Sequence, residues 1–300
     1  MIPYSRTKVP TRCAVCGRTN LVRRDYLKII TYPYRCKRCS PKYRPSFEER
    51  ISSSRARRKH SLDESFFSEI DSEEKTYWLG FLCGDGCITG NKVRLALAVK
   101  DEHHLNRFKA AVKWSGKCYY HKSGAVEVYF RSLRMVGDLA HHHITPRKTY
   151  TVRFPDIPKS LERHFIRGVF DADGCITKQT RITRKKSGRV YVFHGGEFSI
   201  EGNRELVSAI QLRLVELGLP ANSINYAGKN VNRVRYGGIN QLRTIYRYLY
   251  DGATIYLERK KELFDNILEN YHWEQQDTKK ETGLGVELEC GQAGGVQAAD

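Results

Sequence analysis

Acidic residues are scarce in this sequence relative to basic ones: 33 Asp and Glu stand against 52 Lys and Arg, and the formal net charge is +19. Such an excess is difficult to explain without a polyanionic partner, and nucleic acid is the first candidate. Long apolar runs are missing as well, and the opening MIPYSRTKVP contains no apolar signal core. We therefore expect no membrane span and an intracellular protein, located in the cytoplasm or nucleoid or, in a eukaryote, in an organelle.

The sequence also lacks the even number of cysteines that a disulfide framework needs. It has 9 cysteines and no secretory signal, which favours a reducing compartment. Four of them form two pairs, Cys13-x2-Cys16 and Cys36-x2-Cys39, at a spacing typical of a structural zinc ribbon. So short a segment cannot bury enough core to fold alone, and we expect a bound Zn²⁺ to stabilise it. Its role stays open between added DNA contacts and packing against another domain.

Composition divides the chain into five parts. Hydrophobic residues make up 40% and aromatic residues 11%, which is ordinary for a globular protein. The predicted parts are a zinc-ribbon-like module at 1–45, a basic linker at 46–61, two halves of a folded body at 62–158 and 159–273, and a polar, Gly-rich disordered tail at 274–300.

An internal repeat is the most informative feature of the body. The segment YWLGFLCGDGCIT at 77–89 recurs as FIRGVFDADGCIT at 165–177. Similar alternating and helix-like segments follow each copy, so that both halves read helix, strand, strand, helix, strand, strand, helix. The predicted fold class is therefore a duplicated α+β fold with pseudo-twofold symmetry.

Each copy of the repeat is an apolar helix that carries small residues four apart and ends in Asp-Gly. Glycine inside a helix costs roughly 1 kcal/mol relative to alanine, so its presence in both copies indicates close helix packing. If the two helices pack along these small residues, Asp85 and Asp173 arrive side by side at their ends. The small residues are Gly80 and Gly84 in the first copy and Gly168 and Ala172 in the second.

Two carboxylates held close together repel each other unless a divalent cation lies beside them, and oxygen ligands suit magnesium or calcium. Bound magnesium can polarise a phosphoryl oxygen and activate a water molecule, which is the chemistry of phosphodiester hydrolysis. A single Asp-Gly after an apolar run would be typical of a hairpin turn instead. A turn, however, would not require a second matched copy with its own helix glycine.

The segments WLGFLCGDG at 78–86 and IRGVFDADG at 166–174 resemble the motif of the LAGLIDADG homing endonuclease family. The resemblance extends over about 62–271 and implies two αββαββα units whose sheets straddle double-stranded DNA. It also implies Mg²⁺ ligands at Asp85 and Asp173, assisted by the backbone carbonyls of Gly84 and Ala172. The chain departs from the family pattern at Cys83, where an acidic residue often lies, whereas the second copy retains Asp171.

The family also places basic residues near the active site, where they stabilise charge on the phosphate. The resemblance assigns this role to Lys148 in the first half and to Lys260 or Lys261 in the second. Lys100 and Glu201 could contact the groups that bind the metal or could simply end their strands, and we favour the second interpretation. His103 and His104 are interpreted as solvated helix positions.

Basic residues on the predicted strands are the candidate DNA contacts. Alternation in the segment VRLALAVK directs Val93, Leu95, Leu97 and Val99 inward and Arg94 outward. Some of the basic residues should reach base edges and others only phosphates. The second-half candidates are Lys178, Arg181, Arg184, Lys185, Lys186 and Arg189 on one hairpin and Arg233 and Arg235 on another strand.

These features predict a monomeric, site-specific double-strand DNA endonuclease with a long asymmetric target, of the kind encoded in mobile introns. One chain already contains both halves, so no partner is needed to complete the site. Two alternatives stay open, a catalytically silent DNA-binding regulator and an RNA maturase that binds intron RNA. An intein-embedded enzyme is disfavoured, because the tail lacks the His-Asn ending that splicing requires.

Overall fold

The structure is a computed structural model, and it describes residues 7–29, 34–36, 38–39, 46–56, 58–187, 189–228 and 231–276. The chain divides into two compact units, Met1–Arg58 and Lys59–Asp300. None of the helices in the described ranges has the length and apolar character that a bilayer crossing needs.

In the part of the first unit that the structure describes there are a short β-hairpin and two helices. Strand β1 (Lys8–Arg12) pairs antiparallel with β2 (Thr19–Arg23), and helices α1 (Arg24–Ile29) and α2 (Phe47–Ala56) follow. Helix α2 lies in the segment that composition predicted to be a basic linker, without any helix being expected there. Its sequence, FEERISSSRA, has too few apolar residues to show helical periodicity, which explains why the pattern did not reveal it.

The first half of the second unit covers one antiparallel sheet with helices. The sheet has the order β3-β4-β6-β5. Its elements are α3 (Glu73–Gly84), β3 (Gly86–Thr89), β4 (Lys92–Ala98), the 3₁₀ helix η1 (Val99–Asp101), α4 (Glu102–Ala111), β5 (Tyr119–Tyr120), β6 (Ala125–Arg131), α5 (Leu133–His141) and the 3₁₀ helix η2 (Lys148–Tyr150).

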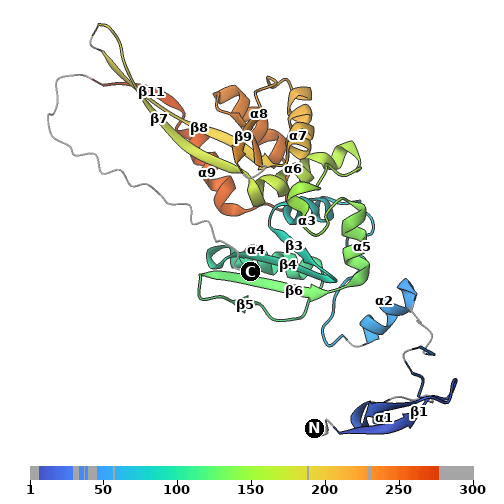
Figure 1. Cartoon of the computed structure of the whole chain (residues 1–300). Coiled ribbons are helices and arrows are strands. Elements are labelled where there is room, and N and C mark those ends of the chain that lie inside the picture. The colour runs from blue at the N-terminus through green and yellow to red at the C-terminus, as the bar shows by residue number, and fades with distance from the viewer. Residues whose placement is uncertain are drawn as a thin grey trace. The chain divides into compact units, whose positions relative to one another are not determined.

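The second half repeats this arrangement and adds one helix and one strand. Strand β8 is the centre of its sheet, with β7 along one edge and β10 and β11 following each other along the other edge. The β7–β8 hairpin extends beyond the helices that cover the sheet (Figure 1). The elements are α6 (Lys159–Asp173), β7 (Cys175–Arg184), β8 (Val190–Gly202), α7 (Arg204–Glu216), β9 (Asn225–Gly228), β10 (Val231–Tyr236), α8 (Ile239–Tyr250), α9 (Glu258–Glu269) and β11 (His272–Gln276).

The order helix, strand, strand, helix, strand, strand, helix is present in both halves, so the predicted duplicated α+β fold is confirmed. Local signals explain much of it. The side chain of Asn203 accepts from the backbone N–H of Leu206 at 2.9 Å and caps α7. At the other end of α7, Gly218 takes the left-handed conformation, with φ +87°, that stops the helix.

Two expectations need correction. Val93, Leu95 and Leu97 are buried as predicted, but Val99 is 43% exposed, because β4 ends at Ala98 and the chain turns into η1. Strand β11 runs into the segment predicted to be a disordered tail, because it pairs with β8 over its whole length. The remainder of that segment, 277–300, lies outside the described residues.

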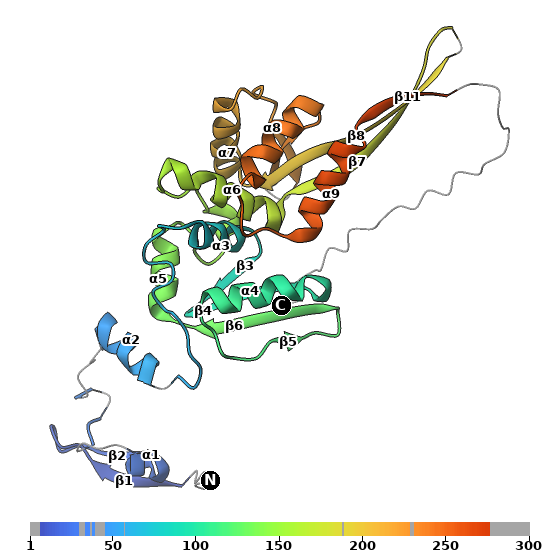
Figure 2. The same ribbon diagram turned by 180° about the vertical axis from the view of Figure 1, so that it is seen from behind.

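Helices α3 and α6 lie side by side between the two sheets (Figures 1 and 2). A Cβ atom at Gly80 would lie 2.1 Å from the carbonyl oxygen of Phe165, and one at Gly168 would lie 2.1 Å from that of Tyr77. Both distances are far inside van der Waals contact, so only glycine allows this approach of the two backbones. The predicted small-residue packing of the repeated helices is therefore confirmed.

Candidate active site at the ends of the paired helices

The two helices bring the candidate carboxylates together at their C-terminal ends. Asp85 caps α3 with its backbone N–H donating to the carbonyl of Phe81 at 3.0 Å, and Asp173 is the last residue of α6. A Cβ atom at Gly84 would lie 2.4 Å from the Cβ of Ala172 and 3.0 Å from Oδ2 of Asp173. The ends of the helices therefore touch with Asp173 at the contact, and Asp85 is close enough for the charge of Asp173 to affect it.

Each of these carboxyl groups is held in an environment that disfavours its charge. Surrounding protein atoms desolvate Asp85 and, together with the negative charge of Asp173, raise its pKa to about 6 although part of the residue is exposed. Desolvation likewise raises the pKa of Asp173. A cation at this point would remove the repulsion, so the pair has the electrostatics of a cation-binding site.

One lysine lies at the end of each motif helix. Lys148 in η2 donates from Nζ to the carbonyl of Cys83 at 2.7 Å and also to that of Gly84. Buried Lys260 in α9 donates to the carbonyls of Phe170 at 2.7 Å and Gly174 at 2.6 Å, and burial lowers its pKa. Both ammonium groups neutralise the negative ends of the helix dipoles beside the carboxylates.

The choice between Lys260 and Lys261, which the sequence left open, follows from their partners. Nζ of Lys261 lies 2.8 Å from Oδ2 of Asp265 on its own helix, away from the carbonyls at the end of α6. Lys260 is therefore the second-half counterpart of Lys148.

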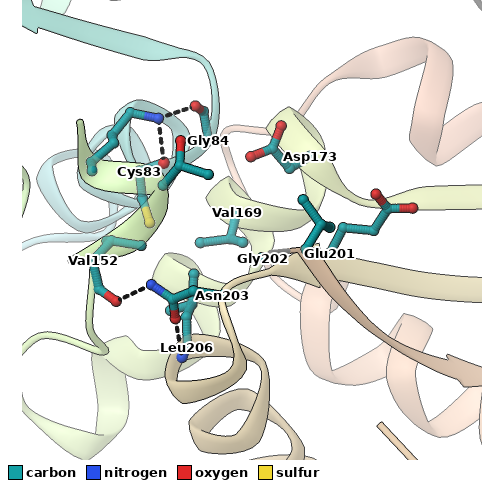
Figure 3. Close-up of a pocket in the computed structure, with 12 residues that line it drawn as sticks. Cys83, Gly84, Val152, Val169, Asp173, Glu201, Gly202, Asn203 and Leu206 are labelled. Atoms are coloured by element: carbon teal, nitrogen blue, oxygen red, sulfur yellow. Dashed lines mark hydrogen bonds between the residues drawn. The ribbon is translucent and has the colours of Figure 1, made fainter. Parts of the chain in front are cut away.

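A cavity opens beside Asp173 (Figure 3). Its volume is about 290 Å³, and its polar walls include Lys148, Glu201 and Asn203. Glu201 also forms an ion pair with Arg233 on the neighbouring strand. We interpreted Glu201 as a strand-end residue, and the structure adds that it lines the same cavity as Asp173. The signal for Glu201 in the sequence was its place in the second half, which corresponds to that of Lys100 in the first.

Asp171, one of the two acidic positions in the second motif, is an internal anchor. Its buried carboxylate accepts from the hydroxyl of Tyr77 at 2.8 Å and from the backbone N–H of Leu257 at 2.8 Å. Desolvation raises its pKa to about 6. Because Leu257 is the N-cap of α9, this bond fixes the helix that carries Lys260.

The same hydroxyl of Tyr77 lies 2.8 Å from Nε2 of His104. Since Tyr77 donates its proton to Asp171, it accepts from His104, whose pKa burial lowers to about 3. The expectation of a solvated His104 was wrong, because α4 turns this side chain into the core. His103 is exposed and pairs with Glu258 at 2.7 Å.

The candidate DNA-contacting residues of the second half divide between two faces of the sheet. In β7, Lys178 and Arg184 share the face of buried Ile176, whereas Arg181 lies on the opposite face. The register through β8 places Arg233 and Arg235 on the same face as Arg181. Lys185, Lys186 and Arg189 are exposed near the turn of the hairpin.

Several of these arginines already have acidic partners. Arg94 is exposed on β4 as predicted and lies 3.4 Å from Glu127, and Arg235 lies 3.5 Å from Glu197. Surface ion pairs are weak, and a phosphate can replace the carboxylate at little cost.

The four paired cysteines form a compact cluster in the first unit. The sulfur atoms of Cys13, Cys16, Cys36 and Cys39 all lie within 4.8 Å of one another. The backbone N–H groups of Val15 and Cys36 lie 3.4 and 3.3 Å from Sγ of Cys13. Hydrogen bonds from the backbone, that of Cys16 first, lower the pKa of Cys13 to about 6. Four cysteine sulfur atoms this close together could hold a metal ion.

No family model matches the chain, and no curated protein matches it in sequence. Among solved structures the chain is similar to LAGLIDADG homing endonucleases. The I-LtrWI enzyme bound to target DNA shares 12% identity, with 69% of this chain and 90% of that chain covered and a TM-score of 0.48. For the meganuclease I-SmaMI bound to uncleavable DNA the identity is 10%, the coverage 67% and 93%, and the TM-score 0.49. For I-GzeII in complex with its DNA target the identity is 11%, the coverage is 70% of this chain and 90% of that chain, and the TM-score is 0.44.

Proposed function

We propose that this chain is a site-specific homing endonuclease of the LAGLIDADG type, which cuts both strands of double-stranded DNA by metal-dependent hydrolysis. The observation that carries the proposal is the meeting of Asp85 and Asp173 at the ends of two glycine-packed helices. Each carboxylate comes from one copy of the repeat, and each helix end has its own lysine. Two such half-sites in one chain fit two scissile bonds on opposite strands.

The donor set at the helix ends fits magnesium, because it consists of oxygen atoms only. Asp85 and Asp173 would hold the ion, and the carbonyl groups of Gly84 and Ala172 would be the assisting donors. Bound Mg²⁺ would polarise a phosphoryl oxygen and lower the pKa of a bound water. The carbonyl of Gly84 accepts a hydrogen bond from Lys148 in this structure, so Lys148 would have to move before that carbonyl assisted a metal.

Lys148 and Lys260 supply fixed positive charge beside the carboxylates. Burial of Lys260 and its two carbonyl partners hold its ammonium group at one position, where it can stabilise charge on a phosphate without reorganisation. Lys148 faces the cavity beside Asp173 and is free to turn from its carbonyl partners toward a bound phosphate.

The net charge of +19 and the two open sheet faces support a long DNA footprint. Because the two halves differ in sequence, the target would be asymmetric and the enzyme monomeric. We assign DNA contact first to the sheet face that carries Arg181, Arg233 and Arg235. In the other sheet we assign it to Arg94. The four cysteines would bind a structural Zn²⁺. The protein would act inside the cell, on a site targeted by a mobile intron.

Cleavage of a randomised duplex-DNA library with magnesium tests the proposal directly. Wild type, Asp85→Asn and Asp173→Asn are compared, and Asp251→Asn serves as a control because Asp251 is an exposed carboxylate at the end of α8. We expect specific double-strand breaks from wild type and the control. The two site variants should bind DNA with little change but lose double-strand cleavage by about a hundredfold or more. Tight specific binding by wild type without cleavage in magnesium or manganese would favour a silent regulator.

A further inference from the structure

A second group of metal-ligand side chains lies on the sheet of the second half, at the pairing of β8 with β11. The nitrogen and carboxylate ligand atoms of His194, His272 and Glu274 all lie within 4.8 Å of one another. His194 and His272 are direct cross-strand partners, and Glu274 follows His272 by two residues, so the pleat brings all three to one face. Neither the paired helices nor the cysteine cluster uses any of these residues.

The distances are close to those of a chelate. Nε2 of His194 lies 3.7 Å from Oε2 of Glu274, and the two imidazole rings are stacked with their centroids 4.9 Å apart and an angle of 24° between them. Neighbouring ligands of a tetrahedral zinc ion lie about 3.4 Å apart, given metal–ligand bonds of about 2.1 Å. Small rotations of exposed side chains are enough to reach that geometry.

The protonation of His272 is set by its backbone partner. Nδ1 of His272 lies 2.8 Å from the carbonyl oxygen of Asn270, and a carbonyl can only accept, so Nδ1 carries the proton. The lone pair of this imidazole is therefore on Nε2. A ligating histidine is oriented in the same way in most metal sites, by donating its other N–H to a carbonyl or carboxylate.

The surroundings leave room for a further ligand. A cavity of about 330 Å³ adjoins His194 and His272, and its polar walls include Lys178, Asn266 and Asn270. The ammonium group of Lys178 favours an anion or a polarised water at the open coordination position. Two imidazoles and one carboxylate suit Zn²⁺ better than Mg²⁺ or Ca²⁺, which prefer oxygen ligands alone.

We propose that His194, His272 and Glu274 bind a Zn²⁺ ion that joins β11 to β8, with water or an anion as the fourth ligand. The ion would fix the last described strand to the long β7–β8 hairpin. This site is separate from the cysteine cluster and does not depend on nuclease activity, so it can be tested in the absence of DNA.

Zinc titration of the full chain against a chromophoric chelator, at micromolar free zinc, measures the number of bound ions. We expect His272→Ala and His194→Ala to bind one equivalent fewer than wild type, and Glu274→Gln to bind that equivalent at least tenfold more weakly. The matched control is His121→Ala, because His121 pairs with Glu127 at 3.4 Å on the other sheet without a second histidine among the described residues. Equal stoichiometry in wild type and both histidine variants would overturn the proposal.

Cobalt substitution gives a second reading on wild type alone, which does not depend on whether a variant folds. Cobalt in the cysteine cluster shows thiolate charge-transfer absorption, whereas cobalt bound by two imidazoles and a carboxylate shows only weaker ligand-field bands. We expect filling of the two sites to give both signatures. Amide hydrogen exchange is a separate measurement, in which zinc should slow exchange in β11 of wild type but not in β11 of His272→Ala. Cobalt spectra that contain thiolate-bound ions alone would contradict the assignment.

Discussion

At the scale of single residues, the protonation of Asp85 makes the stability of the folded protein depend on pH. Desolvation and the negative charge of Asp173 raise its pKa to about 6, above the value of about 3.9 in an unfolded chain. A carboxyl with a raised folded-state pKa favours the folded state when protonated. Its contribution to stability is therefore present below about pH 4 and is lost as the pH rises through about 6.

We expect the free energy of unfolding, in buffer without divalent metal, to fall over this window more steeply in wild type than in Asp85→Asn. The difference should be about 1 kcal/mol, because solvent screens an exposed carboxyl. Urea unfolding of both proteins at several pH values measures it. Asp171 titrates in both proteins, so its contribution to the difference cancels. Parallel curves of unfolding free energy against pH would mean that folding does not change the pKa of Asp85.

The residues that could be predicted from sequence are those that the repeat displays twice. Asp85 and Asp173 occupy matching positions in two copies, and their meeting required only that the helices pack along their small faces. The roles of Asp171, Tyr77 and His104 could not be predicted, because these side chains belong to three helices far apart in the chain. A buried hydrogen bond leaves no periodic signal when its partners are distant in sequence.

At the scale of elements, the pairing of α3 with α6 depends on Gly168. Replacing a helical glycine by alanine ordinarily stabilises a protein by about 1 kcal/mol. Here the new Cβ atom would lie 2.1 Å from the carbonyl of Tyr77 and 2.7 Å from the backbone nitrogen of Phe81, so the helices would have to separate. We expect Gly168→Ala to lower the free energy of unfolding by about 2–3 kcal/mol.

Gly237→Ala is the matched control for Gly168→Ala. The nearest neighbour of a Cβ atom at Gly237 would be the carbonyl oxygen of Gly196, at 3.4 Å. Urea unfolding compares the two variants with wild type. Separation of the helices would also move the two carboxylates apart, so DNA cleavage by Gly168→Ala should fall more than its stability alone explains. A neutral or stabilising effect would show that the helix contact adapts without strain.

The two faces of the β7 strand give a prediction about DNA affinity. Arg181 shares the face of Arg233 and Arg235, whereas Lys178 lies on the face of Ile176 and lines a cavity there. We expect Arg181→Gln to weaken specific binding about tenfold, which corresponds to about 1.4 kcal/mol. Lys178→Gln should change binding by less than about threefold, about 0.6 kcal/mol. Equilibrium binding at several salt concentrations measures both, and equal losses would mean that DNA contacts both faces.

Element boundaries were predictable where a cap or turn residue marks them, as at Asn203 and Gly218 of α7. Strand β11 was not, because its polar sequence HWEQQ acquires its conformation by pairing with β8, from which it is far in the chain. Helix α8 ends at Tyr250 and α9 begins at Glu258, so there is a break between them. Gly252, with φ +69°, lies at that break.

At the scale of the whole molecule, the two units differ in the interactions that stabilise each of them. The second unit has an extensive apolar core that joins both halves of the repeat, including the fully buried Trp78, Phe108 and Phe198. In the first unit, the buried hydrophobic residues that the structure describes are Cys13, Val22 and Cys36. Two of these are members of the thiol cluster. We therefore expect the first unit to depend on metal binding for much of its stability, whereas the second depends on burial of apolar surface.

This difference predicts that the units unfold separately when the cysteine cluster is disrupted. Cys36→Ser removes a buried thiol whose sulfur lies 3.7 Å from that of Cys16, and structural zinc sites supply about 10 kcal/mol or more of folding free energy. We expect calorimetry of Cys36→Ser to show loss of the first unit's transition and no change in the transition of the second. Cys118→Ser, which replaces a thiol outside the cluster in the second unit, should leave both transitions in place.

Because the paired helices are unaffected, Cys36→Ser should still cut the same sites, with affinity lowered about tenfold by the lost basic surface of the first unit. Loss of both transitions together would mean that the second unit needs the first in order to fold.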